Sequence, residues 1–385
     1  MKRVKIMLSI ILVAVMLGCG GCKQSSDDLI LVDIRKNYPR KELILQDFLD
    51  VEYIVLETND EFVNQGGVRN IGKKFILVGT RPDGNGDIFL YERNGKALRK
   101  INHKGQGPGE YIYPTNIILD EDNEEIFVCD GVRAKIFVYD LHGQYKRSFI
   151  QIDGVNFYTD VVNYDRDHLI CYDEDHQELP VFLLVSKQDG SKKEIKISFK
   201  EKRSLTQMSP YDPWHVEDFG YYNKIIHYNG SWILSYVLSD TVYSFLPDYN
   251  NMRPFMVRTP SVQSMGSEFF LLLNLLTDRY YFMETVKNEF NFSTRSGFPR
   301  TYYMYDNREK EFFGYAVYNG DYSIKKEINM SAFRQRNHEE AVQILQSYEL
   351  VEAYKKGELK GKLKEIAAKL DEEDNPVIML VKQKK

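Results

Sequence analysis

The sequence predicts an all-β fold: a six-bladed β-propeller with four-stranded antiparallel blades, a C-terminal helical segment and a last strand that closes the ring. Three observations lead to this prediction. Aromatic residues make up 13% of the chain, and β-branched residues occur throughout it, as suits pleated surfaces. Short strands and glycine turns recur with a period of about 48 residues, which is typical of propeller blades. A short apolar strand near the C-terminus can complete a blade begun near the N-terminus.

The first residues indicate export. Met1–Lys5 is cationic, and Ile6–Leu17 is an apolar run, shorter than the roughly 20 residues of a membrane-spanning helix but suited to a signal peptide. Met16-Leu-Gly-Cys19 resembles a bacterial lipobox, in which the cysteine is lipidated before cleavage. We therefore expect a lipoprotein signal peptide over residues 1–18, with Cys19 lipidated and Cys22 as the alternative. A polar tether and lead-in over residues 19–40 would follow.

The repeat is clearest at the turns between third and fourth strands. Gly95, Gly143 and Gly190 lie 48 and 47 residues apart, and each supplies a glycine where a tight hairpin needs positive φ. The pattern blurs at an insertion over residues 204–222, which contains Pro210, Pro213 and Trp214, and then resumes as strands. The length of the repeating region corresponds to about six blades.

The C-terminal part differs in kind. Residues 337–371 have helical spacing and helix-forming composition, and Asp374-Asn-Pro376 ends this segment. Val377–Val381 then reads as a strand, which we expect to pair with Val51–Leu56 and so remove exposed edges. The propeller would span residues 41–385.

Several segments resemble one known family. They are Val51-Glu-Tyr-Ile-Val-Leu-Glu-Thr58, Gly105-Gln-Gly-Pro-Gly-Glu-Tyr111, Phe137-Val-Tyr-Asp-Leu-His-Gly143, Asp240-Thr-Val-Tyr243 and Asp374-Asn-Pro376. In these the chain resembles six-bladed β-propeller lipoproteins of gut Gram-negative bacteria, related in architecture to NHL and TolB-like propellers. The resemblance implies a lipid anchor in the outer membrane, on its periplasmic or cell-surface side. It implies little about activity, and no catalytic residues can be transferred.

Motifs for common chemistry are absent from the sequence. It contains no Gly-x-Ser-x-Gly elbow and no His-Glu-x-x-His zinc helix. Gly105-x-Gly-x-Gly109 precedes a strand-like segment, so we interpret it as a hinge between blades rather than a phosphate loop, with Tyr111 packing between blades. Asp83-Gly-Asn-Gly-Asp87 favours a hairpin turn over a calcium loop. We expect no cofactor, and a divalent cation is an unsupported alternative. The net charge of −5 argues against nucleic acid as a partner.

Propeller geometry indicates where a ligand would bind. Loops from second to third strands, and connections between blades, open on one face around the channel. The binding candidates expected there are Arg81, Asp83, Asp87, Glu110, Tyr111, Asp130, Arg133, Asp173 and His176. We expect non-catalytic binding of a polar ligand, such as a glycan, a peptide or an envelope protein. The alternative is a propeller enzyme, a metal-assisted lactonase, hydrolase or lyase. Thr241 is a candidate for O-glycosylation, and Cys129 and Cys171 are expected to be buried free thiols.

Overall fold

A computed structural model of the chain describes residues 29–64, 67–151, 157–173, 181–197, 205–212, 214–246, 252–262, 264, 268–335 and 340–384. The expected signal peptide, Cys19, Cys22, the part of the expected tether before residue 29 and His176 lie outside the described residues.

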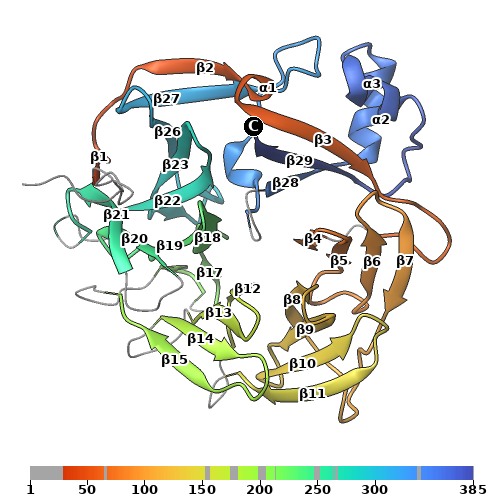
Figure 1. Cartoon of the computed structure of the whole chain (residues 1–385). Helices are drawn as coiled ribbons and strands as arrows, with labels where there is room; N and C mark the ends of the chain where they lie inside the picture. Colours follow the sequence, from red (N-terminus) through yellow and green to blue (C-terminus); the bar gives the residue numbers. More distant parts are fainter. Residues whose placement is uncertain are drawn as a thin grey trace, which may run out of the picture.

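The described residues form a ring of six blades, which confirms the all-β propeller predicted from the sequence (Figure 1). The first strand of each blade lies nearest the central axis, and the later strands lie further out. Loops between second and third strands lie on the same face of the ring as the connections from one blade to the next. We call this the connection face.

The first three blades are four-stranded antiparallel sheets with consecutive strands. Blade 1 contains β4 (Gly67–Ile71), β5 (Phe75–Gly79), β6 (Ile88–Glu92) and β7 (Ala97–Ile101). Blade 2 contains β8 (Pro114–Asp120), β9 (Glu125–Asp130), β10 (Lys135–Asp140) and β11 (Tyr145–Ile150). Blade 3 contains β12 (Asp160–Asn163), β13 (His168–Tyr172), β14 (Phe182–Ser186) and β15 (Lys192–Ile195).

The repeated glycines have the conformation that the sequence predicted. Gly95, Gly143 and Gly190 have φ of +91°, +83° and +76° in the turns between third and fourth strands. An L side chain rarely adopts this conformation, so the turn itself requires glycine. The regular spacing of these glycines in the sequence therefore corresponds to the same turn in each of the first three blades.

Blades 4 and 5 each receive a fifth, outermost strand from the N-terminal part of the chain. Blade 4 contains β18 (Ile225–Tyr228), β19 (Ser231–Leu234), β20 (Thr241–Phe245), β21 (Met252–Thr259) and β1 (Ile30–Asp33). Blade 5 contains β22 (Phe269–Leu276), β23 (Tyr280–Lys287), β26 (Arg300–Asp306), β27 (Glu311–Tyr318) and β2 (Arg40–Ile44). Both added strands run parallel to their neighbours. Part of the expected tether and lead-in is therefore built into blade 4.

Blade 6 closes the ring with strands from both parts of the chain. It contains β28 (Glu340–Leu345), β29 (Val377–Gln383) and β3 (Leu49–Val55), and the short helix α1 (Leu45–Phe48) precedes β3. β29 pairs with β3 in antiparallel register, from Val377 opposite Val55 to Gln383 opposite Leu49. The predicted pairing of the C-terminal strand with the N-terminal strand is confirmed.

The helical segment is shorter than the sequence predicted. Helices α2 (Ser347–Lys355) and α3 (Gly361–Ala367) connect β28 to β29, and a 3-10 turn, η2 (Met330–Ala332), precedes β28. The expectation of helix from residue 337 was wrong for Glu340–Leu345, which pairs with β29 as a strand. Pairing within the closing blade overrides the local helix propensity.

Side chains from both neighbours fill the space between blades 1 and 6. Phe89 and Tyr91 of blade 1 share one apolar cluster with Ile378 and Leu380 of blade 6. Asn375, just before β29, is 1% exposed. Its side-chain amide donates to the carbonyls of Glu57 (2.8 Å) and Phe62 (2.6 Å), and its side-chain oxygen accepts from the Asn64 N–H (2.8 Å). Hydrogen bonds of the Asn375 side chain thus link the C-terminal segment to the segment after β3.

Candidate functional site

The predicted site residues of blade 1 lie between β5 and β6 on the connection face. Arg81 and Asp83 are exposed, whereas Asp87 is 3% exposed. The Asp87 carboxylate accepts a hydrogen bond from the Asn102 side chain at 2.7 Å and pairs with Lys100 at 3.1 Å. The Asp87 side chain therefore stabilises this loop from within, whereas Arg81 and Asp83 face solvent.

Tyr111 is fully buried between blades 1 and 2, as the hinge interpretation proposed. It packs in one cluster with Leu77 of blade 1 and Phe137 of blade 2. Its hydroxyl donates to the Gly86 carbonyl at 2.7 Å. Burial raises the pKa of Tyr111 to about 12, so the phenol remains a neutral donor.

Glycines in the hinge make room for a neighbouring carboxylate. Glu110 is half-buried and turns back onto its own loop, where one of its oxygens accepts from the Gly107 N–H at 2.7 Å. A Cβ at Gly105 would lie 2.1 Å from the same carboxylate. A side chain at Gly105 would therefore displace the Glu110 carboxylate from its bond to Gly107. The segment leads into strand β8 rather than a helix.

Asp130 links the connection between blades 1 and 2 to a turn of blade 2. It is fully buried, and its carboxylate accepts from the backbone N–H groups of Ile112 (2.6 Å), Val132 (2.8 Å) and Arg133 (3.1 Å). The Arg133 guanidinium donates to the Gly107 carbonyl at 2.9 Å. Asp130, Arg133 and Glu110 thus meet around the glycine hinge.

The remaining predicted residues lie apart from that hinge. Asp173 follows β13 in blade 3 and is 1% exposed. Thr241 begins β20 and is half-buried. Cys129 and Cys171 are buried free thiols in one cluster between blades 2 and 3, as predicted, and burial raises the pKa of both. Across the described ranges, no group of three or more His, Cys, Asp or Glu side chains has the arrangement of a metal site.

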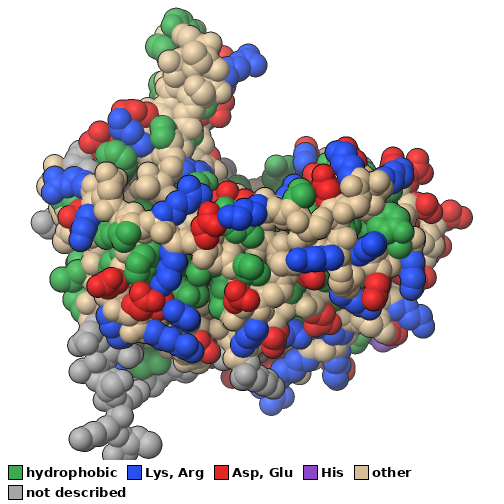
Figure 2. Space-filling view, turned by 90° about the horizontal axis from the view of Figure 1, so that it is seen from above, with side chains coloured by type: hydrophobic (Ala, Val, Ile, Leu, Met, Phe, Trp, Pro, Cys, Tyr) green, Lys and Arg blue, Asp and Glu red, His purple; other side chains and the backbone are tan. Residues whose placement is uncertain are grey.

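Two short hairpins build a lobe on the connection face that the sequence analysis did not predict. β16 (Gln207–Met208) pairs with β17 (Val216–Glu217) in the connection from blade 3 to blade 4. β24 (Phe290–Asn291) pairs with β25 (Ser296–Gly297) in the loop between β23 and β26 of blade 5. Figure 2 shows a projection rising from one face of the ring, on the side where blades 4 and 5 lie.

Contacts between the hairpins make the lobe one unit. The Gln207 side chain donates to the Asn288 carbonyl at 3.1 Å, and the rings of His215 and Phe292 meet in a T-shaped contact with centroids 5.5 Å apart. The hydroxyls of Tyr211 and Ser293 lie 3.4 Å apart. Residues some 80 positions apart in the chain are thus held together in the lobe.

Arg300 fixes the base of the lobe to blade 5. Its guanidinium donates to the Glu284 carboxylate and to the Phe219 carbonyl, which belongs to the connection that carries the first hairpin. Glu284 is 2% exposed. Burial raises the pKa of Glu284, and the nearby Arg300 opposes this change without cancelling it.

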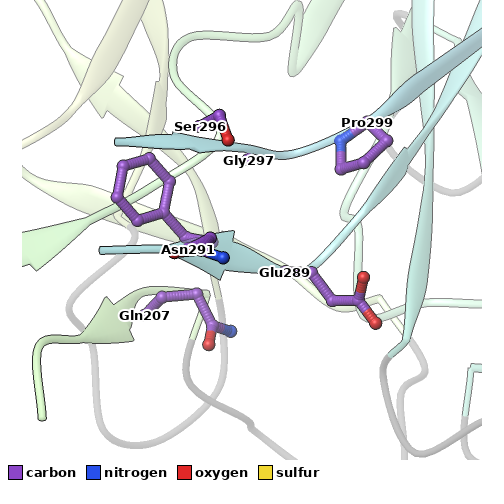
Figure 3. Close-up of a pocket in the computed structure, with 7 residues that line it drawn as sticks. Gln207, Glu289, Asn291, Ser296, Gly297 and Pro299 are labelled. Atoms are coloured by element: carbon purple, nitrogen blue, oxygen red, sulfur yellow. The ribbon is translucent and has the colours of Figure 1, made fainter. Parts of the chain in front are cut away.

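A pocket of about 540 Å³ lies between β16 and the β24–β25 hairpin (Figure 3). Its lining combines amides, a carboxylate, a hydroxyl and one aromatic ring, from Gln207, Glu289, Phe290, Asn291, Ser296, Gly297 and Pro299. In Figure 3 the polar ends of Gln207 and Glu289 lie along the same edge of the hairpin. The lining can exchange several hydrogen bonds with a polar ligand beside an apolar surface.

Large apolar side chains stand exposed on the same lobe. Trp214 is 91% exposed, Tyr211 78% and Met208 64%, whereas the other tryptophan, Trp232, is 5% exposed. Exposed aromatic groups on a projecting lobe are typical of binding surfaces, although these three side chains do not line the pocket itself. The sequence carried a signal for this surface, because Trp214 lies in the proline-containing insertion that interrupts the repeat.

None of the helices within the described residues has the length and apolar character needed to cross a membrane.

Comparison with solved structures finds this fold in two Bacteroides proteins. BF0058 of Bacteroides fragilis NCTC 9343, assigned as an exported protein, aligns with 93% of this chain and 100% of its own length, with a TM-score of 0.60 and 14% identity. A member of the DUF4221 family from Bacteroides vulgatus ATCC 8482 aligns with 88% of this chain and 99% of its own length, with a TM-score of 0.51 and 12% identity. At these identities the likeness shows the fold alone.

Comparison of the sequence with curated proteins finds no match. The sequence does match a family described as a domain of unknown function, DUF4934, over residues 29–382. The closer relationship to NHL and TolB-like propellers stays a prediction. Because the match covers nearly the whole propeller, the chain belongs to the DUF4934 family.

Proposed function

We propose that this protein is an exported, lipid-anchored propeller of the bacterial envelope that binds a glycan at the lobe and does not transform it. The pocket between the two hairpins carries this proposal, because a polar lining lies on the same lobe as strongly exposed aromatic side chains.

Sugar chemistry matches both parts of this surface. A pyranose ring presents a face of C–H groups that stacks on an aromatic ring, and its hydroxyls both donate and accept hydrogen bonds. Trp214 and Tyr211 offer the aromatic surface. The Gln207 side-chain oxygen offers an acceptor, and the Asn291 side-chain nitrogen offers a donor, since the Asn291 oxygen already accepts from the Ser293 and Thr294 N–H groups. The pocket volume of about 540 Å³ falls in the range of small-molecule sites.

The composition of the pocket favours binding over hydrolysis. Among the lining residues that the structure describes, Glu289 supplies the carboxylate, and one of its oxygens lies 2.6 Å from the Lys287 ammonium. Most glycosidases require two carboxylates on either side of the scissile bond. The Glu289 carboxylate, paired with a cation, suits orientation of a hydroxyl.

The location of the protein is proposed from its leader and its resemblance to envelope lipoproteins. Lipidation at Cys19 would hold the propeller at the outer membrane, on the periplasmic or cell-surface side. Metabolic labelling with an alkyne fatty acid tests this. Loss of label in Cys19→Ser and its retention in Cys22→Ser would support the assignment, the reverse result would move it to Cys22, and an unlabelled wild-type chain would contradict the anchor.

Intrinsic fluorescence offers a direct test of glycan binding. The chain has two tryptophans, and Trp214 is exposed while Trp232 is buried, so a ligand at the lobe should change the emission of Trp214. The mature protein would be titrated with a panel of oligosaccharides. We expect a saturable change that Trp214→Phe removes. Gln207→Ala and Asn291→Ala should weaken binding about tenfold each, the equivalent of one hydrogen bond of about 1.4 kcal/mol.

Tyr348→Ala is the matched control, because Tyr348 is 54% exposed on α2, outside the lobe. It should leave binding unchanged. Products that appear during the titration would support the enzyme alternative instead. If no oligosaccharide in the panel binds, the glycan proposal is wrong, and a protein partner at the exposed aromatic surface becomes the hypothesis to test.

A further inference from the structure

Lys224 is a buried cation at the start of the inner strand of blade 4. The residue is 4% exposed, and its ammonium nitrogen lies 4.3 Å, 5.0 Å and 5.2 Å from the ring centres of Tyr222, Tyr221 and Tyr172. Within the described residues, this ammonium has no carboxylate within ion-pair distance and donates no hydrogen bond. A buried charge without such partners is costly, and the faces of aromatic rings offset part of that cost.

A second cation contacts the same tyrosine from another blade. The guanidinium carbon of Arg334 lies 4.2 Å from the ring centre of Tyr221, which is 36% exposed. The backbone of Arg334 exchanges two hydrogen bonds with Val342 of the inner strand β28, at 3.0 Å and 3.1 Å. Arg334 is thereby held beside the central axis, and two positive charges from blades 4 and 6 share the Tyr221 ring.

Blade 1 adds a third cation to this region. Arg69, on the inner strand β4, lines a small cavity of about 20 Å³ together with Arg334. Blade 3 contributes the opposite charge, because Asp160 at the start of β12 accepts a hydrogen bond from the Tyr221 hydroxyl at 3.2 Å. The Arg69 guanidinium donates to the Thr80 carbonyl at 2.6 Å, and Glu340, which lines the same cavity, pairs with Arg93 at 2.9 Å. Lys224 and Arg334 are therefore the cations nearest the shared tyrosine.

We infer that this group, Lys224, Tyr221 and Arg334, is a binding site for an oxyanion on a small ligand: a carboxylate, sulfate or phosphate group. Lys224 supplies a compact charge, and Arg334 adds a guanidinium, one terminal nitrogen of which also donates to the Ser331 carbonyl at 3.1 Å. A bound oxyanion would give the Lys224 ammonium the acceptor that it lacks among the described residues.

Three tyrosines around a cation resemble a cage for a ligand amine, but this arrangement favours the anion. The Lys224 ammonium already lies over the three rings, where the amine of a ligand would bind in such a cage. A second cation from a ligand would be repelled by Lys224 and Arg334. The oxyanion site does not depend on the glycan proposal, because it uses different side chains from those of the lobe pocket.

Calorimetry with simple anions tests the inference. The mature protein would be titrated with sodium sulfate, inorganic phosphate and glucuronate, with glucose as the neutral control and ionic strength held constant. We expect saturable binding of at least one anion, no binding of glucose, and at least tenfold weaker binding in Lys224→Met. Sulfate or phosphate alone would identify a tetrahedral oxyanion as the ligand group, and glucuronate alone would identify a carboxylate.

Three further variants make the test decisive. Arg334→Gln changes a half-buried side chain, and it should weaken anion binding even if the buried Lys224→Met fails to fold. Lys356→Met, at an exposed lysine after α2, should leave binding unchanged. Trp214→Phe should also leave it unchanged, which separates this site from the lobe. Absence of saturable binding by all three anions, or equal binding by wild type and Arg334→Gln, would overturn the inference.

Discussion

The Lys187 ammonium lies 2.6 Å from a carboxylate oxygen of Asp120, and each side chain is 1% exposed. This ion pair joins the end of β14 in blade 3 to the end of β8 in blade 2. Partners this deeply buried depend on each other, because either charge alone would have lost its water without gaining a counterion.

Replacing Lys187 by methionine should destabilise the protein by about 3–5 kcal/mol, since it leaves Asp120 buried and uncompensated. Urea denaturation followed by circular dichroism measures this change. Lys356→Met removes the exposed pair with Glu352 and should leave the free energy of unfolding nearly unchanged, because solvent screens that pair. Equal effects of the two substitutions would contradict the burial argument.

Asn375→Ala should weaken the closure of the ring. It removes hydrogen bonds to the Glu57 and Phe62 carbonyls and to the Asn64 N–H, so we expect a loss of about 3 kcal/mol. The measurement is the free energy of unfolding, together with proteolysis of the segment after β3. Asn94→Ala, at an exposed turn residue that accepts from the Lys96 N–H, should cost about 1 kcal/mol or less. A small effect at Asn375 would mean that the strand pairing alone closes the ring.

Gly95→Ala should be far more damaging than Gly67→Ala. Gly95 has φ of +91°, and an added Cβ would lie 2.0 Å from the Val55 carbonyl oxygen of blade 6. Nothing lies within 4 Å of the corresponding position at Gly67. Thermal unfolding should show a loss of about 2–3 kcal/mol at Gly95 and a change below about 1 kcal/mol at Gly67. Similar melting temperatures for the two variants would disprove the steric argument.

The free energy of unfolding should fall at acid pH, in part because the Glu125 carboxylate becomes protonated. Burial raises the pKa of Glu125, but hydrogen bonds from Arg147 and Lys146 outweigh burial and leave the pKa below its ordinary value of 4.5. The ionised carboxylate therefore stabilises the fold above about pH 4.5, and this contribution is lost as the pH falls through the lowered pKa. Denaturant titrations at a series of pH values between 3 and 7 measure how the free energy of unfolding changes with pH.

Arg147→Met should lower stability by about 2 kcal/mol at neutral pH, because it removes both of the 2.7 Å hydrogen bonds to that carboxylate. The variant should also have a shallower loss of stability below pH 4.5. An acid slope identical to that of the wild type would assign the pH dependence to other groups.

The blade repeat was predictable from the sequence because one turn in each of the first three blades requires glycine. Gly95, Gly143 and Gly190 mark the period because a left-handed turn excludes side chains, and the closing strand was recognisable from its apolar run. β1 and β28 were not recognised. The pairing of β1 with β21 joins segments more than 200 residues apart, and β28 has a helix-forming sequence that only its neighbour β29 turns into a strand.

The candidate site was less predictable than the fold. The sequence indicates which acidic residues lie in loops, but it does not show whether a carboxylate points outward or, like Asp130, accepts hydrogen bonds from its own turn. The lobe is built from strands of two residues each, which are too short to give a periodic pattern. Its two hairpins come together through contacts such as that of Gln207 with Asn288, which link distant parts of the chain.

The composition of blade 6 has a consequence for biogenesis. Leu49–Val55 emerges early from the ribosome, and its partner Val377–Gln383 is synthesised more than 300 residues later. Until then the early strand lacks its neighbour, so the ring stays open while the chain is translated. For the export proposed above, an unclosed ring suits a polypeptide that crosses a membrane unfolded, because the final pairing becomes available when both segments have reached the same compartment.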